Sequence, residues 1–200
     1  MAGRAMNGRI SSFAFLLLLA GCSGEPATPT AAPLAGAKIG GPFTLINEDG
    51  ARVDEQAFAG KWRIVYFGYT FCPDVCPVDA AAIGAGLKAF EAQAPERGRQ
   101  IVPIFITVDP QRDTPAVLKA FTANFHPRMV GLTGSADEIG AAAKSYAIYF
   151  KAQPPSSGGG YMVDHSRTTY LMDPKGAPVA LLPADQGGDA VAAQLAKWVR

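Results

Sequence analysis

The sequence predicts an α/β domain in which helices flank a central mixed sheet. Two runs of β-branched and aromatic residues, 64–67 and 101–108, have the composition of strands that are buried on both faces. Helical patterns separate the strands along the chain, and a hairpin followed by a helix ends it. This order favours one sheet covered by helices, and residues 42–200 are enough to enclose one core.

Turn and capping residues assign the remaining elements. In chain order we expect a hairpin within 43–53, a helical turn ending at Gly60, a helix from Pro77 to Phe90, a helix opened by Thr114 and Pro115, a helix opened by a capping box at 135–138, a strand at 147–150, and a hairpin of 168–172 with 178–182. The last helix packs Val191, Leu195 and Trp198 on the core. Strands that alternate with helices before a terminal hairpin and helix are typical of the thioredoxin-like fold.

Two cysteines lie at the junction of the first buried strand and the helix that follows it. The strand ends at Gly68, and Cys72 and Cys76 come next, each directly before a proline. Pro77 suits the first position of a helix, where its missing N–H costs no hydrogen bond. Unpaired N–H groups and the dipole at a helix start stabilise anions. We therefore expect at least one of the two thiols to ionise more readily than a free cysteine.

The first residues, 1–21, have the pattern of a lipoprotein signal peptide. Arg4 and Arg9 precede an apolar run that is shorter than the roughly 20 residues of a membrane-spanning helix. The run closes on residues 19–22, Leu-Ala-Gly-Cys, which resemble the bacterial lipobox. Cys22 is therefore expected to carry lipid and to hold the domain on the periplasmic side of a bacterial membrane. The alternative is an ordinary signal peptide with an incidental cysteine.

The segment after the lipobox, 22–41, is predicted to be a flexible linker. It is rich in Pro, Ala, Thr and Gly and has no periodicity, so the folded domain is expected to span 42–200. Removing Arg4 and Arg9 with the signal peptide changes the balance from 18 basic against 17 acidic residues to 16 against 17. A nearly neutral chain without a basic run gives no reason to expect nucleic acid as a partner.

With Cys22 acylated, Cys72 and Cys76 are the only thiols left in the sequence. The three residues between them leave three interpretations open. A structural disulfide suits an exported protein, but it would close a very small loop. Metal binding and thiol redox chemistry are the other two, and the spacing alone does not choose between them.

A metal site needs a further ligand, and the chain has two histidines. His126 falls at the end of a predicted helix, where a partly cationic imidazole suits the dipole, so we expect a structural role. His165 follows a Gly-rich loop and precedes a core strand. With the two cysteines it makes a set too small for a closed zinc site but suited to copper, because thiolates select Cu(I) and imidazole accepts either oxidation state. Met162 and Met172 are also soft ligands, but methionines in strand-like segments are more often core residues.

Several segments together resemble the Sco/SenC family, and the resemblance runs in order from about residue 42 to the C-terminus. They are 68–77 around the two cysteines, 108–115, 163–166 around the second histidine, and 170–174. The family is membrane-anchored and thioredoxin-like, and it binds copper through two cysteines and one histidine. By this resemblance the copper ligands are Cys72, Cys76 and His165.

The resemblance also implies a role in assembling the dinuclear copper centre of cytochrome c oxidase. The protein would deliver copper, as Cu(I), Cu(II) or both, or reduce the thiols of the acceptor site. The expected partners are the copper-site subunit of the oxidase, together with another periplasmic copper carrier or a thiol reductant. A non-enzymatic copper chaperone is the leading interpretation. A thiol–disulfide oxidoreductase that acts on the acceptor cysteines is the alternative, and a copper-responsive redox sensor is a third.

Two further features lie close to these motifs. Val78 and Asp79 stand where small hydroxyl residues are frequent in the family, and Asp79 is expected to change the charge that a partner meets. In the second segment, Asp109 is expected to end a strand, and Asp113 with Thr114 to cap a helix. A role of this segment in shaping the metal loop is the less favoured alternative.

Overall fold

The computed structural model describes residues 1–3, 31–156 and 158–200. Cys22 and nearly all of the predicted signal peptide therefore lie outside the described residues. Within the described ranges, no helix combines the length and the apolar character that crossing a bilayer requires. The folded domain and the candidate site lie in the residues after this segment.

The compact unit spans Ala31–Arg200 and so begins earlier than the predicted boundary at residue 42. The N–H of Leu34 donates to the carbonyl of Val179 at 3.1 Å. The side chains of Leu34 and Ile39 pack against the core. Residues 31–41 of the predicted linker therefore belong to the folded domain, because their apolar side chains and N–H groups find partners on it.

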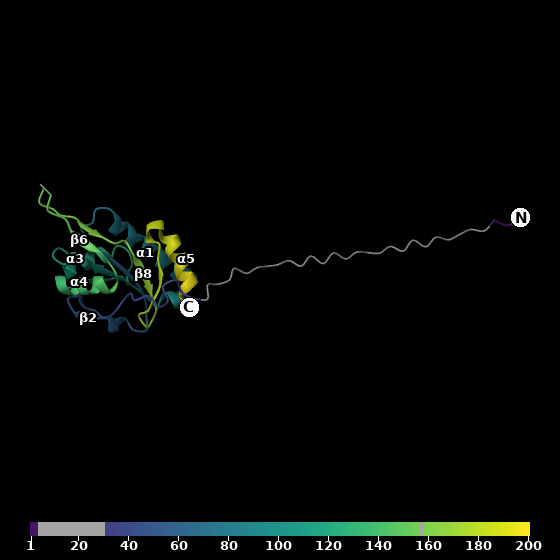
Figure 1. The fold of residues 1–200 in the computed structure, drawn as a ribbon, viewed down its shortest axis with the longest axis horizontal. Helices are drawn as coiled ribbons and strands as arrows, with labels where there is room; N and C mark the ends of the chain where they lie inside the picture. The colour runs from purple at the N-terminus through teal and green to yellow at the C-terminus, as the bar shows by residue number, and fades with distance from the viewer. Residues whose placement is uncertain (4–30, 157) are drawn as a thin grey trace. The chain divides into compact units, whose positions relative to one another are not determined.

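A seven-stranded mixed sheet forms the centre of the domain (Figure 1). Its spatial order is β2-β1-β5-β4-β3-β8-β9. The strands are β1 (Thr44–Asn47), β2 (Arg52–Asp54), β3 (Trp62–Gly68), β4 (Ile101–Thr107), β5 (Val130–Thr133), β8 (Thr169–Met172) and β9 (Pro178–Leu181). Strands β3, β4 and β5 run parallel, and the other pairings are antiparallel. A separate two-stranded ribbon consists of β6 (Phe150–Ala152) and β7 (Val163–His165).

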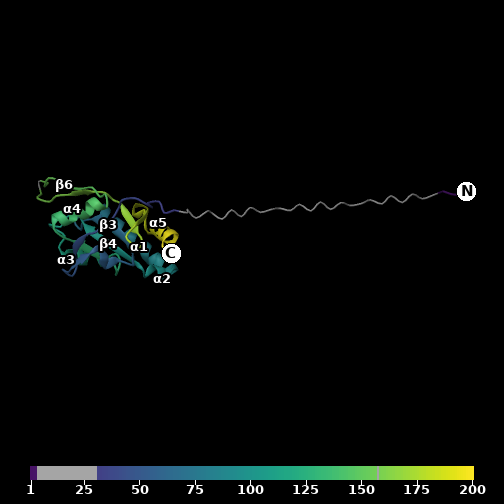
Figure 2. The ribbon, with the colours of Figure 1, turned by 60° about the horizontal axis from the view of Figure 1, so that its bottom comes forward.

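Helices cover both faces of this sheet. They are α1 (Val75–Gln93), α2 (Pro95–Gly98), α3 (Pro115–Thr122), α4 (Ala136–Ser145) and α5 (Gly188–Trp198), with short 3-10 turns η1 (Glu55–Phe58) and η2 (Ala184–Gln186). Figure 2 shows α4 on one side of β3 and β4, and α2 and α3 on the other. The alternation of side chains along β3 and β4 explains the two layers. The ring of Phe105 lies 5.0 Å from Phe121 of α3, whereas the ring of Phe67 lies 5.5 Å from Tyr146 at the end of α4. The predicted capping box at the start of α4 is confirmed.

Helix α1 packs tightly between the end of α3 and helix α5. A Cβ atom at Gly84 would lie 2.5 Å from the carbonyl oxygen of Phe125, just after α3. A Cβ atom at Gly86 would lie 2.6 Å from the Cβ of Val191 in α5. The two glycines therefore permit contacts that fix the helix, and with it the position of its first turn at the sheet edge.

The strand predicted at 147–150 begins only at Phe150. Ala147 has a positive φ of 53°, and the N–H of Ile148 donates to the carbonyl of Ala143 at 2.8 Å. These residues terminate α4 and turn the chain before the ribbon starts. A short apolar run cannot by itself distinguish a helix end from a strand, which explains the error.

Replacing Gly86 by Ala should destabilise the domain, although Ala is favoured over Gly inside a helix by about 1 kcal/mol. The new Cβ would lie 2.6 Å from the Cβ of Val191 and 2.7 Å from the carbonyl oxygen of Gly188, so α1 and α5 would have to move apart. Thermal unfolding followed by circular dichroism should show a lower midpoint. Gly140→Ala in α4 is the matched control, because nothing lies within 4 Å of its Cβ and its midpoint should rise. A Gly86→Ala midpoint at or above the wild-type value would contradict this packing argument.

Candidate metal centre

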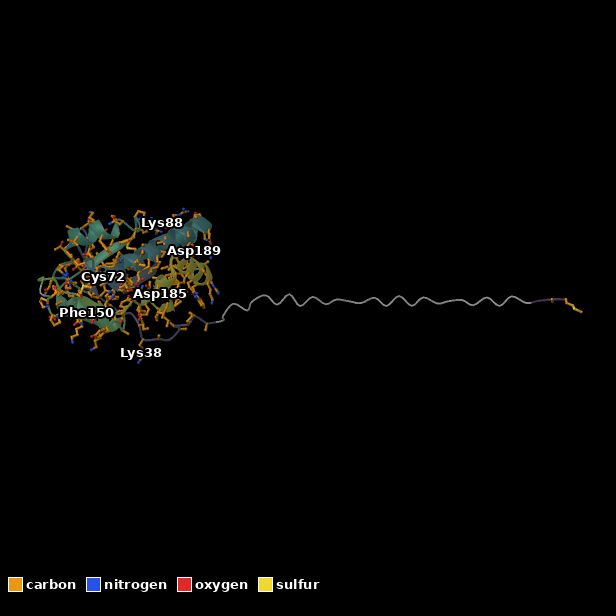
Figure 3. The ribbon with its side chains drawn as sticks, turned by 90° about the horizontal axis from the view of Figure 1, so that it is seen from above. Lys38, Cys72, Lys88, Phe150, Asp185 and Asp189 are labelled. Carbon is orange, nitrogen blue, oxygen red and sulfur yellow. The ribbon has the colours of Figure 1, made fainter. Side chains whose placement is uncertain are left out.

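The three residues predicted as copper ligands come together at one end of the domain. Cys72 lies in the loop between β3 and α1, Cys76 lies in the first turn of α1, and His165 is the last residue of β7. Their ligand atoms all lie within 4.8 Å of one another, and the Sγ of Cys76 is 3.0 Å from the Nε2 of His165. In Figure 3, Cys72 lies toward the end of the domain that holds Phe150, away from Lys88. Among the described residues this is the one group of three such side chains close enough to share a metal ion.

The helix that carries Cys76 begins earlier than predicted. Helix α1 starts at Val75, so Pro77 occupies its third position and not its first. Proline is tolerated there because the N–H groups of the first turn have no partner within the helix. The N–H of Cys76 instead donates to the Sγ of Cys72 at 3.5 Å. The N–H groups at the helix start therefore favour a thiolate chiefly on Cys72, which lies just outside the helix.

The backbone at the end of β3 leaves room for the sulfur of Cys76. A Cβ atom at Gly68 would lie 3.1 Å from this sulfur and 2.8 Å from the Cε1 of Tyr66. Any side chain at Gly68 would push on both groups. The glycine that the sequence identifies only as a strand end is thus a packing requirement of the site.

A buried carboxylate, Asp113, fixes the loop that carries Cys72. Thr70 donates to it from its N–H at 3.0 Å and from its hydroxyl at 2.6 Å, and the hydroxyl of Thr107 donates to it at 2.6 Å. Thr114 caps α3 without its help. The expectation that Asp113 caps this helix is therefore wrong, because its carboxylate oxygens accept hydrogen bonds from Thr70 and Thr107 instead. The less favoured expectation, that the segment shapes this loop, describes what Asp113 does.

Asp109 and Arg112 join the cysteine side of the site to the β6–β7 ribbon. Asp109 pairs with Arg112 and accepts the hydroxyl proton of Tyr161 at 2.7 Å. The guanidinium of Arg112 donates to the carbonyl of Tyr161 at 3.0 Å and lies 3.8 Å from the centre of that ring. It also lies 5.0 Å from the ring of Phe71, next to Cys72. Strand β4 ends at Thr107, so Asp109 does not end the strand as expected. It instead joins Arg112 and Tyr161 at one side of the site.

The orientation of His165 is fixed by its neighbours. Its strand pairs with β6, where Phe150 lies opposite it. Its Nδ1 is 3.0 Å from the carbonyl oxygen of Ser166. Because a carbonyl can only accept, Nδ1 carries the proton in the neutral ring, and the lone pair of Nε2 faces the sulfurs. The rings of Tyr66 and Tyr69 meet the imidazole edge-on, with centroids 6.2 and 5.9 Å away.

The two thiols differ in acidity. Burial opposes ionisation of Cys72, but the N–H groups of Cys76 and Asp74 outweigh it, so the pKa of Cys72 lies below its ordinary value. Burial raises the pKa of Cys76 far above its ordinary value. Burial also lowers the pKa of His165. At neutral pH the site therefore combines an easily ionised outer thiol, a protonated inner thiol and a neutral imidazole, which confirms the prediction that one thiol is unusually acidic.

The other candidate ligands lie outside this cluster. His126 is buried, its Nδ1 accepts the N–H of Arg128 at 3.1 Å, and its Nε2 faces Glu91 at 3.4 Å. This is the structural role predicted for it, but burial lowers its pKa, so the expected partial positive charge is wrong. Met172 is buried in β8, and Met162 is an exposed residue just before β7.

Asp79 is not a surface charge, contrary to expectation. Its carboxylate is fully buried, where it accepts the hydroxyl proton of Tyr66 at 3.0 Å and pairs with Arg167 at 2.7 Å. Because helix α1 starts before Pro77, Asp79 faces inward from its second turn. The charge that reaches the surface here is that of Arg167.

Three exposed large apolar side chains lie within three residues of a candidate ligand in the sequence. They are Phe71, Val78 and Met162. Cys72 is 8% exposed and Cys76 is 0% exposed, so a partner can reach the pair only from the side of Cys72. Apolar surface beside a buried reactive group is typical of a site that meets another protein.

A mixed sheet with helices on both faces and a thiol pair at a strand end define a thioredoxin-like domain, here with a histidine that completes a three-ligand cluster. The chain belongs to the SCO1/SenC family, whose sequence model matches residues 31–200. The predicted thioredoxin-like fold and the predicted family are both confirmed.

Individual relatives agree with this assignment. Protein SenC of Rhodobacter capsulatus is 48% identical over 70% of this chain and 62% of its own length. Mitochondrial protein SCO1 of Saccharomyces cerevisiae is 44% identical over 69% of this chain and 46% of its own length. The crystal structure of Arabidopsis thaliana ScoI with copper bound is 40% identical, has a TM-score of 0.74, and aligns with 80% of this chain and 96% of that one. The matched sequence thus spans about half the length of these full-length relatives.

Cys72 should react with iodoacetamide faster than Cys76 in the reduced protein at neutral pH. Its pKa is lowered and it is partly accessible, whereas the pKa of Cys76 is raised and its sulfur is buried. Timed quenching followed by peptide mass spectrometry separates the two rates. Denatured protein is the control, since both cysteines should react alike there. Equal rates in the folded protein would contradict the asymmetry.

Proposed function

We propose that this protein is a membrane-anchored copper carrier that serves assembly of the dinuclear copper centre of cytochrome c oxidase. The observation that carries the proposal is the convergence of Cys72, Cys76 and His165, whose donor atoms lie within 4.8 Å. Relatives support it: ScoI of Bradyrhizobium japonicum and yeast Sco1, 38% and 39% identical to this chain, have been solved with copper bound. BsSco, at 26% identity, is described as a member of the Sco family of cytochrome c oxidase assembly proteins.

The donor set fits copper that is to be passed on. Two thiolates favour Cu(I), and the imidazole of His165 also suits Cu(II). The lone pair of its Nε2 is already directed at the sulfurs, so no tautomer change is needed. Three protein ligands leave a position for a ligand of the acceptor, unlike the closed four-ligand sites that retain zinc.

Binding must displace protons from the thiols, chiefly from Cys76. Because its pKa is raised, the proton on Cys76 competes with copper throughout the neutral range. Copper affinity should therefore rise with pH. Conversely, acid returns the proton to the inner thiol and favours release.

The exposed apolar side chains near the centre suit the partner contact that delivery requires. Phe71 adjoins Cys72, and Val78 is the second residue after Cys76. The copper-site subunit of the oxidase would meet this surface, and a periplasmic copper carrier or a thiol reductant would load or reduce the site. Transfer would begin at Cys72, the ligand that is partly accessible.

The lowered pKa of Cys72 favours a second candidate function, thiol–disulfide exchange. The Cys72 thiolate would attack a disulfide of the acceptor and form a mixed disulfide, releasing one acceptor thiolate. Cys76 would then give its proton to the acceptor thiolate already released, attack Cys72 and release the second acceptor thiolate. The acceptor would leave with two reduced sulfurs and this protein with a Cys72–Cys76 disulfide.

The membrane anchor is proposed from the sequence alone. The Leu-Ala-Gly-Cys run at 19–22 follows a basic and then an apolar segment, as a lipoprotein signal peptide requires. Lipid on Cys22 would hold the domain at the periplasmic face. The residues between Cys22 and Ala31 would act as its tether.

The reduced protein should bind one copper ion, and oxidation to a Cys72–Cys76 disulfide should abolish binding, because it removes both thiolates. His165→Ala should weaken binding by at least about 10–100-fold, the effect of losing a mere hydrogen-bond partner of a ligand. Competition titration with a chromophoric chelator at several pH values measures each affinity. Equal affinity of the oxidised and reduced proteins would rule out this site.

His165→Ala also separates the two candidate functions in cells. The variant should keep its thiol exchange, which the N–H groups around Cys72 largely set. If delivery is the function, cells with this variant should lack oxidase activity. Normal oxidase at low copper with His165→Ala, but not with Cys72→Ser, would favour the reductase instead.

Cys22→Ala should leave the domain folded but release it from membranes, because acyl chains are the proposed anchor. Fractionation of cells and immunodetection measure the distribution, and the wild type serves as control. A variant that stays in the membrane fraction would show that another segment or a partner holds it.

A further inference from the structure

An ion pair with one buried member lies beside the proposed copper centre. The guanidinium of Arg167 makes a two-point contact with the carboxylate of Asp79, from Nη2 at 2.7 Å and from Nε at 3.1 Å. The hydroxyl of Tyr66 donates to the same carboxylate at 3.0 Å. Both oxygens of this carboxylate therefore accept hydrogen bonds, and the donors, Arg167 and Tyr66, lie close to the metal ligands.

The pair joins the two segments that carry those ligands. Asp79 is the third residue after Cys76 in helix α1, and Arg167 is the second residue after His165, between β7 and β8. The ligand strand β7 is not part of the main sheet, since it pairs only with β6. Among the described side-chain contacts, Arg167–Asp79 is the ion pair that ties the histidine segment to the cysteine helix.

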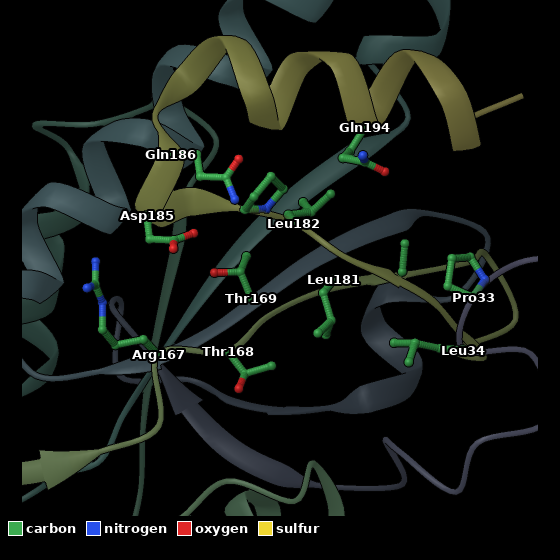
Figure 4. Close-up of a pocket in the computed structure, with 12 residues that line it drawn as sticks. Pro33, Leu34, Arg167, Thr168, Thr169, Leu181, Leu182, Asp185, Gln186 and Gln194 are labelled. Atoms are coloured by element: carbon green, nitrogen blue, oxygen red, sulfur yellow. The ribbon is translucent and has the colours of Figure 1, made fainter.

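The two partners differ in exposure in a way that suits a tether. The side chain of Asp79 is 1% exposed and that of Arg167 is 42% exposed. Arg167 lies at one end of a pocket of about 670 Å³, with Asp185 and Thr169 near it and Pro33 at the far end (Figure 4). The buried Asp79 is thus held on helix α1, and Arg167, which reaches over to it, lies in the segment that follows His165.

We propose that Arg167 is a positioning residue that holds His165 against the cysteine pair through its two-point contact with Asp79. This inference rests on the proposed copper binding and specifies what keeps the third ligand in place. A bidentate contact between a planar guanidinium and a carboxylate restricts both distance and orientation. Tyr66 extends the effect, because it bonds Asp79 with its hydroxyl and meets the imidazole with its ring. Without Arg167, the site should behave as a dithiolate with a loosely held imidazole.

The test compares Arg167→Met and Arg167→Lys with the wild type in the reduced full-length protein, using copper alone as the probe. Arg167→Met should reduce Cu(II) affinity by about 10-fold or more, the range seen when a group that orients a metal ligand is removed. Its electron paramagnetic resonance spectrum should lose the nitrogen hyperfine coupling of the imidazole. Arg167→Lys, which restores the charge with a single contact point, should recover part of both. Cu(I) affinity should change less, since the two thiolates remain.

Arg52→Met is the matched control. It also removes an arginine from an ion pair, with Glu138 at 2.7 Å, but at strand β2 on the opposite edge of the sheet from β8 and β9. Its copper affinity and spectrum should equal those of the wild type. Thermal unfolding of every variant, with binding measured well below the midpoint, separates loss of fold from loss of positioning.

Arg167→Met leaves the buried carboxylate of Asp79 without its cationic partner and could fail to fold for that reason. In that case the double variant Asp79→Asn with Arg167→Gln, which has no charge at either position, replaces Arg167→Met in the test. Loss of the nitrogen coupling in the double variant supports the proposal. Wild-type affinity and wild-type coupling in a folded variant without Arg167 overturn it. A wild-type protein that binds no copper overturns the proposed function itself, so the two failures are distinguishable.

Discussion

The site depends on the close approach of the Cys76 sulfur to the imidazole of His165, 3.0 Å apart, above the end of strand β3. Strand β3 is buried along its whole length and pairs with β4 and β8, so its end cannot shift to make space. The approach is possible because Gly68 has no side chain to meet the sulfur. A sulfur and a nitrogen held this close, with the nitrogen lone pair facing the sulfur, can share either a proton or a metal ion.

The environment gives the two sulfurs different properties. N–H groups at the helix start stabilise a thiolate on Cys72, whereas burial keeps the proton on Cys76. The outer sulfur can therefore make the first bond to an incoming ion or disulfide, and the inner sulfur completes the reaction only when it releases its proton. The same asymmetry serves copper transfer and thiol exchange, so geometry at the sulfurs does not choose between them. The distinction lies with His165, which only the metal site needs as a ligand.

The sequence predicts the features of this site that depend on short segments. Strand β3, its glycine end and the cysteine pair follow from composition and turn residues, and the resemblance at 163–166 identifies His165. The start of α1 could not be placed, because proline is compatible with several positions of a first turn. The role of Asp113 was only the less favoured interpretation, because its partner Thr70 is 43 residues away and Thr114 beside it offers a local explanation. Asp79 and Arg167, 88 residues apart, meet only through tertiary packing, which no local pattern encodes.

The ion pair of buried Asp79 and partly exposed Arg167 also explains how a ribbon outside the main sheet can present a ligand accurately. Apolar contacts would hold the chain after β7 near α1, but they would leave its rotation and register loosely defined, since dispersion has little directionality. Burying a carboxylate is unfavourable unless its oxygens are satisfied, and here Arg167 and Tyr66 satisfy them. Because Arg167 stays partly in water, most of the desolvation cost of the pair falls on the Asp79 carboxylate. Orientation of His165 is thus obtained from an ion pair whose buried member lies on the rigid helix that also carries Cys76.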